Sequence, residues 1–308
     1  TYYIGSNNAV VDADDNLIFS LSSDSYLATI VKVNGSTGAV VFSNTLDFDG
    51  SFSLNAIGID SNSNIIVAGH ANTSQGLAFV AKLNATATSI TWQHTFTIDG
   101  NANSEIYALD VDFNNDIIVV GKAEVTSQVN GQAVVEYQIF VAKVASAGTQ
   151  VWQKVLQLDN ESEGRGTGLS LDSIGNIYVT GEYYVEGGQY QIWGGRKSNA
   201  IVVFKMTTQG VVAWDRRVGP GECSWVGVST AVGSDGDLYL YASTYENNPA
   251  GDTDNGQSGY WTSRLILARY NKATGAVIWQ SYFDNPLAQE VPGWGNDAPC
   301  GGYATDLM

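Results

Sequence analysis

One pattern of four short segments recurs five times along the 308 residues, and it constrains the fold more than any other feature. Each copy opens with a short apolar segment and a turn of Asp, Asn and Gly residues, at 9–16, 57–64, 109–116, 169–176 and 230–237. A second apolar segment follows directly, with the sequences LIFSL, IIVAG, IIVVG, IYVTG and LYLYA. The third segment carries one basic residue at a fixed place, namely Lys32, Lys82, Lys143, Lys205 or Arg269. The fourth contains an aromatic residue, namely Phe42, Trp92, Trp152, Trp214 or Trp279.

Each copy predicts four short β-strands joined by turns, because Asp, Asn and Gly favour tight turns and no stretch has the helical period. The second segments are apolar on both faces, which predicts strands covered on both sides. The fourth segments alternate, as in residues 90–94, which predicts an outer strand half in water. Four-stranded sheets repeated every ~40–60 residues are the blades of a β-propeller, whereas solenoid units are shorter. We therefore predict an all-β fold, a single β-propeller domain over 1–308 with four-stranded blades, five complete repeats and one extra strand. The repeats lie at about 8–54, 55–104, 105–164, 165–222 and 223–285.

Two families share these motifs. The stretch DSIGNIYVTG (172–181), the segment FVAKLN (79–84) and a closing G-x-x-x-W resemble the bacterial β-propeller (SBBP) repeat. The stretch YNKATGAVIW (270–279) resembles the tryptophan-docking turn of quinoprotein (PQQ-like) propellers. A glycine stands four residues before the aromatic in four repeats, whereas the second repeat has Thr88. The resemblance implies the fold and little about function, because propellers host many unrelated activities.

The sequence contains five repeats and the start of a sixth. Residues 301–308 (GGYATDLM) match the start of the third repeat, so the chain ends on the first strand of a sixth unit. Three interpretations remain open: a fragment of a larger propeller, an extra strand on a five-bladed ring, or a strand that pairs with another subunit. The last predicts self-association through the terminal strand.

Composition excludes several classes of partner. Fourteen Lys and Arg against 31 Asp and Glu give a net charge of −17, which would repel nucleic acids and anionic lipids. No apolar run approaches the ~20 residues of a membrane-spanning helix, so no membrane span is expected. Thr1 is consistent with a processed or truncated N-terminus.

The two cysteines and four sequons favour an extracellular or cell-surface location. Cys223 and Cys300 both lie at the entry to a first strand, where a disulfide would pin the last strand to its neighbour; two free thiols are the alternative. Glycosylation sequons occur at Asn34, Asn72, Asn84 and Asn160.

No catalytic or cofactor-binding set is recognisable. His70 and His94, the only histidines, lie in different structural settings, and no nucleophile elbow or zinc-protease motif is present. The Asp-x-Asp/Asn-x-Asn turns, such as that at Asp12, lack the Gly and Glu of a calcium-binding EF-hand loop. We expect no cofactor and interpret these residues as turn-forming, with weak Ca²⁺ binding as the alternative. The repeated Lys or Arg is expected to bond to a turn Asp or a backbone carbonyl.

Departures from the repeat are where a site is expected. The predicted connections between second and third strands are long in the last three repeats, at 122–138, 182–199 and 243–263, and 285–300 adds a further segment on the same face. This face holds the aromatic residues that suit stacking on sugars or anchoring a protein interface: Tyr190, Trp193, Trp225, Tyr260, Trp261 and Trp294. The alternative is that these loops pack on one another.

Three functions follow. The first is a non-catalytic extracellular β-propeller that acts as a structural, self-associating surface or filament module. The second is a carbohydrate- or protein-binding adhesin module that uses the aromatic loop face. The third is a glycosidase or lyase with loop carboxylates such as Glu186, Glu222 and Glu246.

Overall fold

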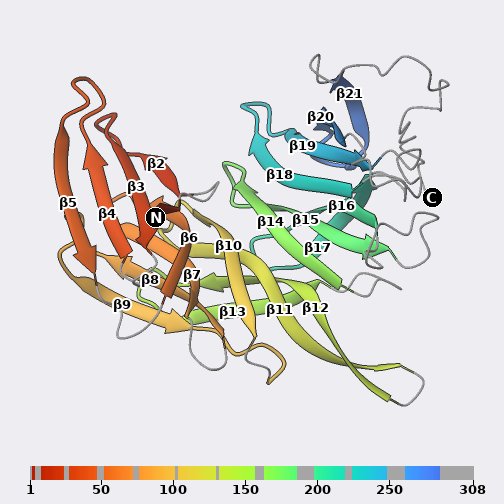
Figure 1. The fold of residues 1–308 in the computed structure, drawn as a ribbon, viewed down its shortest axis with the longest axis horizontal. Helices are drawn as coiled ribbons and strands as arrows, with labels where there is room; N and C mark the ends of the chain where they lie inside the picture. The colour runs from red at the N-terminus through yellow and green to blue at the C-terminus, as the bar shows by residue number, and fades with distance from the viewer. Residues whose placement is uncertain are drawn as a thin grey trace, which may run out of the picture. The chain divides into compact units, whose positions relative to one another are not determined.

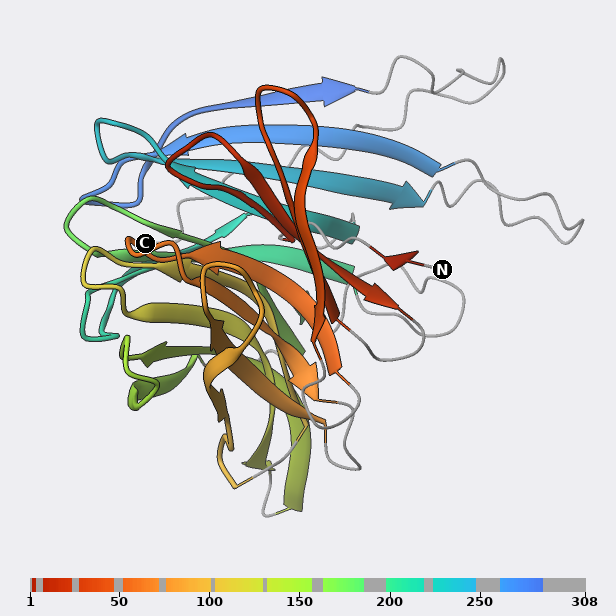
Figure 2. The ribbon, with the colours of Figure 1, turned by 90° about the vertical axis from the view of Figure 1, so that its left-hand side faces the viewer.

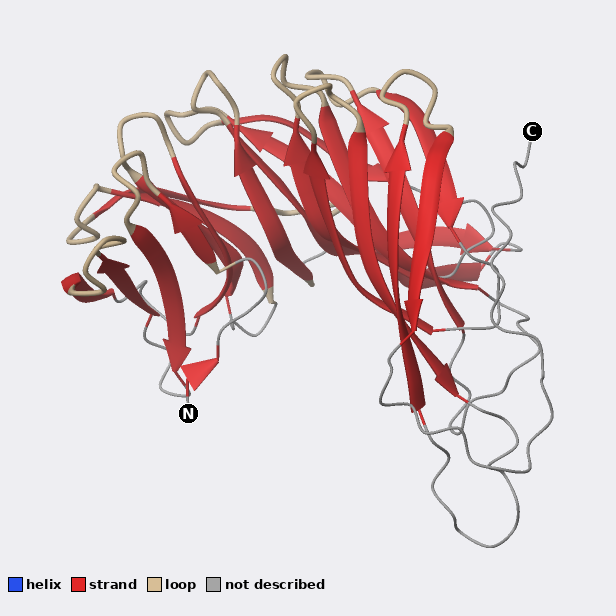
Figure 3. Cartoon of the chain, turned by 90° about the horizontal axis from the view of Figure 1, so that it is seen from above, coloured by secondary structure: helices blue, strands red, loops and turns tan. Residues whose placement is uncertain are grey.

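The structure is a computed structural model that describes residues 2–3, 8–23, 28–46, 52–71, 76–100, 103–129, 132–156, 163–185, 198–218, 224–247 and 261–284. All regular structure in these ranges is β-strand, arranged in five antiparallel sheets (Figure 1 and Figure 3). Each sheet is formed by strands that follow one another in the chain, which is the blade arrangement of a β-propeller. The predicted fold class is confirmed. The chain divides into two compact units, Thr1–Gln157 and Leu158–Met308.

The first unit contains blades 1 to 3 (Figure 2). Blade 1 consists of β1 (Tyr2–Tyr3), β2 (Ala9–Val11), β3 (Leu17–Ser23), β4 (Ala28–Val33) and β5 (Val40–Leu46). Here β1 and β2 pair with successive parts of β3 and together occupy the place of a first strand. Blade 2 consists of β6 (Phe52–Ile59), β7 (Ile65–Ala71), β8 (Leu77–Leu83) and β9 (Ile90–Thr95). Blade 3 consists of β10 (Ser104–Val111), β11 (Ile117–Val129), β12 (Gln132–Val144) and β13 (Gln150–Leu156).

The second unit contains blades 4 and 5. Blade 4 consists of β14 (Glu163–Leu171), β15 (Ile177–Val185), β16 (Ser198–Met206) and β17 (Val212–Val218). Blade 5 consists of β18 (Ser224–Val232), β19 (Leu238–Asn247), β20 (Trp261–Tyr270) and β21 (Val277–Asp284). The predicted strand at 301–308 lies outside the described residues.

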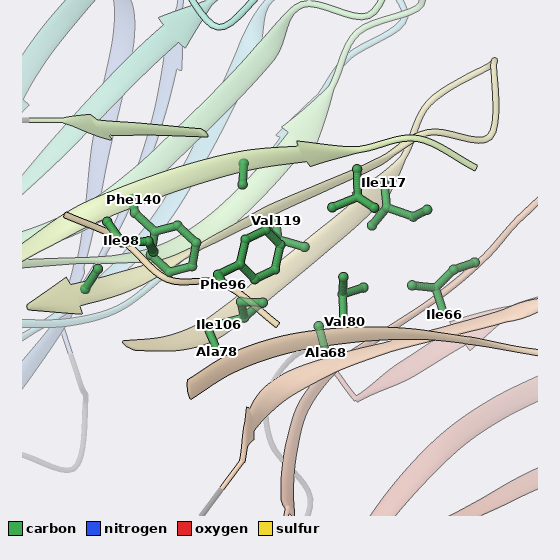
Figure 4. Packing of buried hydrophobic residues seen from close by; sticks show 13 residues of the cluster. Ile66, Ala68, Ala78, Val80, Phe96, Ile98, Ile106, Ile117, Val119 and Phe140 are labelled. Atoms are coloured by element: carbon green, nitrogen blue, oxygen red, sulfur yellow. The ribbon is translucent and has the colours of Figure 1, made fainter. Parts of the chain in front are cut away.

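Burial follows the strand order within a blade. In blade 2 the second strand β7 is buried on both faces apart from half-buried His70, whereas the outer strand β9 alternates between half-buried and exposed side chains. Between blades 2 and 3, apolar side chains of both sheets form one buried cluster, in which Phe96 and Phe140 lie 5.9 Å apart between ring centroids (Figure 4). Face-to-face packing of neighbouring sheets therefore supplies the core, as the sequence predicted.

The turn between first and second strands is held by its first aspartate. In blade 1, Asp12 Oδ1 accepts hydrogen bonds from the backbone N–H groups of Asp14 and Asn16, both at 2.9 Å. The repeated base closes the same turn, because Lys32 Nζ lies 2.6 Å from Asp12 Oδ2. Matching pairs join Lys82 to Asp60 and Lys143 to Asp112.

The last two blades vary this arrangement. In blade 5, Arg269 bonds to Asp237 and Asp235, whereas in blade 4, Lys205 donates to the carbonyl of Lys272 at 2.7 Å. The expected bond to a turn Asp or a backbone carbonyl is confirmed, and so is the turn-forming role of the aspartates.

The three predicted long connections are partly strand. At 182–199 the β15–β16 ladder extends to the pair Val185–Ser198, and at 243–263 the β19–β20 ladder extends to the pair Asn247–Trp261, so Trp261 lies in a strand. Residues 122–138 are predicted as a long loop, but β11 and β12 continue as a paired hairpin whose ladder runs from Ile117–Val144 to Val129–Gln132 (Figure 1). Cross-strand pairing therefore orders most of this segment. No helix in the described ranges is long and apolar enough to cross a membrane.

Candidate functional site

A bulge near the start of the first strand shapes the candidate site. The register shifts between Leu54 and Ala56 in β6 and between Ile106 and Ala108 in β10. Opposite the bulge in β10, strand β11 has a glycine, Gly121. A larger residue would not fit there, because a Cβ on Gly121 would lie 1.8 Å from the carbonyl oxygen of Glu105. Gly69 stands in the same relation to Ser53. The bulge thus brings the backbones together and re-aims the side chains beside it.

Glu105 is the centre of a polar cluster that this bulge positions. Across the β10–β11 ladder it faces Lys122, whose Nζ lies 3.3 Å from Glu105 Oε2. Tyr107, the bulged residue, donates its hydroxyl to the same oxygen at 2.7 Å. Lys122 Nζ lies 5.7 Å from the ring centroid of Tyr107 and 5.1 Å from that of Tyr137 on β12. Side chains from three strands of blade 3 therefore gather around Lys122, and two of these strands supply contacts to the Glu105 carboxylate.

Blade 2 supplies the remaining contacts. His70 Nδ1 lies 3.3 Å from Glu105 Oε1, and Asn55 Nδ2 donates to the same oxygen at 3.0 Å. Asn55 Nδ2 also donates to the carbonyl of Ile106 at 2.9 Å. Glu105 thus links two blades. We call Asn55, His70, Glu105, Tyr107, Lys122 and Tyr137 the Glu105 cluster.

These contacts fix the charge of Glu105. Burial alone would raise the pKa of this carboxyl, but the hydrogen bonds from His70 and Tyr107 and the charges of His70 and Lys122 lower its pKa to about 2. The carboxylate is therefore ionised at neutral pH. A carboxylate held in this state is poorly suited to general acid or base work, which needs a pKa near the working pH.

The cluster remains open to solvent. All six side chains are half-buried, and that of Lys122 is 31% exposed. The polar groups and tyrosine rings of the Glu105 cluster are of the kinds that line sugar-binding sites. In such sites the sugar hydroxyls bond to polar side chains, and the C–H faces of the sugar rings pack on aromatic rings.

Blade 4 carries a charged pair at the same level with the signs exchanged. Arg165 on β14 precedes a bulge at Gly166 and Gly168 and pairs with Glu182 on β15, as Glu105 pairs with Lys122. Arg165 Nε and Nη2 donate to Glu182 Oε2 at 3.2 and 3.0 Å, and the Glu182 side chain is buried. Blades 3 and 4 therefore share the backbone bulge at this position but carry different charged side chains beside it.

Sequence reasoning placed no member of the Glu105 cluster in a site, and it named His70 only to set it aside as a catalytic residue. The missed signal is the polar residue directly after the repeated glycine of the second strand, in Gly69-His70, Gly121-Lys122 and Gly181-Glu182. His94, the other histidine, contacts Gln150 Oε1 through Nε2 at 3.3 Å.

The predicted aromatic loop face lies mostly beyond the described residues. Tyr190, Trp193, Tyr260 and Trp294 are outside them, as are Glu186 and Glu222. For Trp225 and Trp261 the structure gives the backbone, opposite Thr244 and Asn247 in the β19 ladders, and Glu246 pairs with Thr262. The loop-face site stays a prediction.

Cys223, Cys300 and two sequons, Asn72 and Asn160, also lie outside the described residues. Asn34 and Asn84 open the turns between third and fourth strands of blades 1 and 2. Each accepts backbone hydrogen bonds there through Oδ1, from Thr37 and Thr88 respectively. Among the described residues, no group of three or more His, Cys, Asp or Glu side chains is placed to hold a metal ion.

Comparison with known proteins identifies the fold. No family model matches the chain, and no curated protein matches it. A solved ulvan lyase, a polysaccharide lyase bound to a saccharide that contains GlcA, is 12% identical, with a TM-score of 0.52 over 94% of this chain and 76% of that one. The quinohemoprotein alcohol dehydrogenase ADHIIG from Pseudomonas putida HK5 is 9% identical, with a TM-score of 0.47 over 91% of this chain and 53% of that one. The Dos1 propeller is 7% identical, with a TM-score of 0.43 over 89% and 72%. At these identities the similarities concern the fold alone.

Proposed function

We propose that this chain is a non-catalytic, extracellular β-propeller module that binds a neutral carbohydrate at the Glu105 cluster. The observation that carries the proposal is the half-buried cluster itself. Hydrogen-bonding groups from blades 2 and 3 contact one ionised carboxylate, and two tyrosine rings of blade 3 lie beside Lys122. The repeat motifs further support a place among propellers of the bacterial β-propeller repeat type.

A binding role fits the state of Glu105 better than a catalytic one. Its two oxygens take contacts from His70, Asn55, Tyr107 and Lys122. A carboxylate so occupied acts as a scaffold that orients its donors, and the donors present their remaining hydrogen-bonding capacity to a ligand.

A neutral ligand fits the charge of the site and of the chain. Lys122 and Glu105 offset each other's charge within the cluster, and the chain carries −17 overall. A polyanion would be repelled at long range, whereas a neutral saccharide would not. Tyr107 and Tyr137 supply the apolar contact that sugar rings need.

The test is titration calorimetry with neutral oligosaccharides and, separately, with uronic-acid oligosaccharides. We expect a neutral oligosaccharide to bind, and Tyr137→Ala and Lys122→Met each to weaken binding ~10-fold or more, since each removes a stacking or charge-assisted contact. Lys154→Met, which removes an exposed lysine of β13, is the matched control and should bind as the wild type does. Unchanged affinity in both cluster variants, with folding verified by circular dichroism, would refute the site.

A polysaccharide lyase is the second candidate. It is supported by the contact between His70 and Glu105, an arrangement that can orient a histidine as a base, and by the fold shared with the ulvan lyase. A lyase would act on a uronic-acid polymer and release unsaturated chain ends that absorb in the near ultraviolet. Release of such ends that is lost in His70→Gln would favour this candidate over the binding module.

A further inference from the structure

The hairpin of strands β11 and β12 extends beyond the other two strands of blade 3 (Figure 1). Strand β10 pairs with β11 only as far as Ala123, and β13 pairs with β12 only as far as Ile139. The ladder between β11 and β12 then continues alone, beginning with the pair Glu124–Tyr137. The Glu105 cluster lies at the point where this two-stranded extension begins.

One face of this hairpin continues the surface of the Glu105 cluster. Residues directly opposite each other in an antiparallel pair share a face of the sheet, and so do residues two apart along a strand. Lys122 on β11 lies opposite Glu105 on β10. Glu124, two residues further along β11, lies opposite Tyr137 on β12. Glu124 and Tyr137 therefore lie on the same face as Glu105 and Lys122.

Side-chain contacts agree with this placement. Asn103, two residues before Glu105, donates from Nδ2 to Glu124 Oε2 at 2.5 Å. Lys122 Nζ lies 5.1 Å from the ring centroid of Tyr137. We call Glu105 and Lys122 the first rung of this face, and Asn103, Glu124 and Tyr137 the second rung. The two rungs form one continuous polar and aromatic surface.

Backbone hydrogen bonds hold the second rung in place. The N–H of Glu124 donates to the carbonyl of Asn103 at 2.8 Å, and the N–H of Thr126 donates to Asp99 Oδ2 at 3.2 Å. Residues before β10 thereby bond to the edge of β11 that β10 leaves unpaired. On the side of blade 2, a Cβ on Gly76 would lie 3.4 Å from Asn103 Oδ1. Groups that are fixed before a ligand arrives lose less conformational entropy when it binds.

The second rung and the pair beyond it offer the groups that a sugar chain needs. Asn103 is exposed, and Glu124 and Tyr137 are half-buried. Their amide and carboxylate can bond to sugar hydroxyls, and the tyrosine ring can pack on the C–H face of a sugar. The next pair on this face, Thr126 and Val135, is exposed on both strands, with 53% of Val135 accessible to solvent. A ligand at the first rung therefore has room to continue along the hairpin.

We propose that the neutral carbohydrate binds as an extended chain, which runs from the first rung across the second rung toward Val135. This inference rests on the proposed sugar-binding function and adds the class of ligand, an oligosaccharide of three or more units. Thr126 is four residues on from Lys122 along β11, which is roughly 13 Å of strand and longer than one sugar ring. A single sugar cannot contact both ends of this surface, whereas a chain can.

The charge on this face favours a neutral chain over an acidic one. The two rungs carry the carboxylates of Glu105 and Glu124 against the single ammonium group of Lys122. Glu124 is bonded to the neutral amide of Asn103, which does not offset its charge. A uronic-acid chain would bring a further carboxylate beside Glu124, and like charges repel. The second rung therefore selects against acidic saccharides.

Affinity measured against chain length tests the proposal. The probes are glucose and its β-1,4-linked oligomers of two to four units, with the corresponding mannose and galactose series, titrated by calorimetry and, for the weakest ligands, by NMR. We expect the trimer of at least one neutral series to bind ~10-fold or more tightly than its monomer. The trimer of galacturonic acid should bind no more tightly than galacturonic acid itself, because its carboxylates meet Glu124.

Two variants remove contacts beyond the first rung. Glu124→Ala removes an acceptor of the second rung, and Val135→Asp puts a charge on the exposed apolar residue beyond it, where a substitution leaves the core intact. Each should weaken binding of the neutral trimer ~5-fold or more and leave binding of the monomer unchanged. Glu136→Ala is the matched control and should bind both ligands as the wild type does, since Glu136 is a half-buried carboxylate on the opposite face of β12.

The outcomes separate this inference from the function on which it rests. Absence of binding in every neutral series, at every length, would overturn both. A monomer that binds as tightly as its trimer, with binding weakened in Tyr137→Ala, would support the sugar site and overturn the extended chain. A gain with chain length that persists in both Glu124→Ala and Val135→Asp would show that the chain leaves the first rung in another direction, and this result would also overturn the inference.

Discussion

Lys82 Nζ lies 2.6 Å from Asp60 Oδ2, and both side chains are almost fully buried at the turn of blade 2. Burial alone would raise the pKa of Asp60, but hydrogen bonds from Lys82 and Asn64 hold its pKa below the usual value. The pair closes a turn whose backbone the same carboxylate already organises through the N–H groups of Asn62 and Asn64.

Lys82→Met should therefore destabilise the chain by about 3 kcal/mol, because it leaves a buried carboxylate without its cation. Urea unfolding followed by circular dichroism measures the loss. Lys154→Met, at an exposed position, should change the free energy of unfolding by less than ~0.5 kcal/mol. An equal loss of unfolding free energy in Lys82→Met and Lys154→Met would show that the Lys82–Asp60 pair does not stabilise the turn.

Gly121→Ala tests the close approach at the bulge. Its Cβ would lie 1.8 Å from the carbonyl oxygen of Glu105, so the strands must separate. We expect a loss of about 2–3 kcal/mol in the free energy of unfolding. Gly100→Asn is the control, since Gly100 has a φ of +74° and no atom within 4 Å of a built Cβ. A stable Gly121→Ala chain with an intact sugar site would count against the glycine requirement.

Acid should destabilise the chain partly through Glu105. Because the folded-state pKa of about 2 lies below the ordinary value of 4.5, the stability that its ionisation contributes is fully present above about pH 5 and is lost as the pH falls from 4.5 toward 2. Glu105→Gln cannot titrate, so its urea midpoint should fall less steeply than that of the wild type in this window. Parallel pH curves for the two proteins would show that Glu105 is not held ionised by its neighbours.

The same substitution should cost stability at one glycine turn and almost none at another. Gly148→Asn places a Cβ against the Trp92 ring, and we expect it to lower the free energy of unfolding by about 2 kcal/mol. Gly38→Asn meets no neighbour and should change it by less than ~0.5 kcal/mol. Thermal and urea unfolding of both variants would make the comparison. A similar loss at both turns would mean that strain at positive φ, rather than the covering indole, sets the cost.

Much of the fold could be predicted from the sequence because each blade repeats the same local chemistry. The Asp turn, the fixed base at Lys143 and the aromatic at Trp92 are each set by contacts within a blade or with the next one, so their spacing shows in the sequence. The hairpin at 122–138 was predicted as a loop, although Asn130-Gly131 between β-forming residues is a strong signal for a two-residue hairpin.

The Glu105 cluster was harder to predict because it depends on register across three strands and on contact between two blades. Nothing near Glu105 in the sequence indicates that a bulge will place Tyr107 beside it or that Asn55, fifty residues earlier, will donate to it. The residue after the repeated glycine of the second strand differs between repeats, and this difference points to Lys122 and His70. It does not point to Glu105, the residue that both contact.

The contact of Trp92 in blade 2 with the glycine turn at Gly148 in blade 3 has a consequence for how such a chain grows over generations. A duplicated blade would arrive with its own glycine turn and its own outer-strand aromatic, because both lie within one stretch of sequence, as Gly148 and Trp152 do. It would fit between existing blades without any new contact having to evolve. Gene duplication can therefore lengthen this protein one blade at a time, while selection alters only the few residues, such as Glu105 and Arg165, that differ from copy to copy.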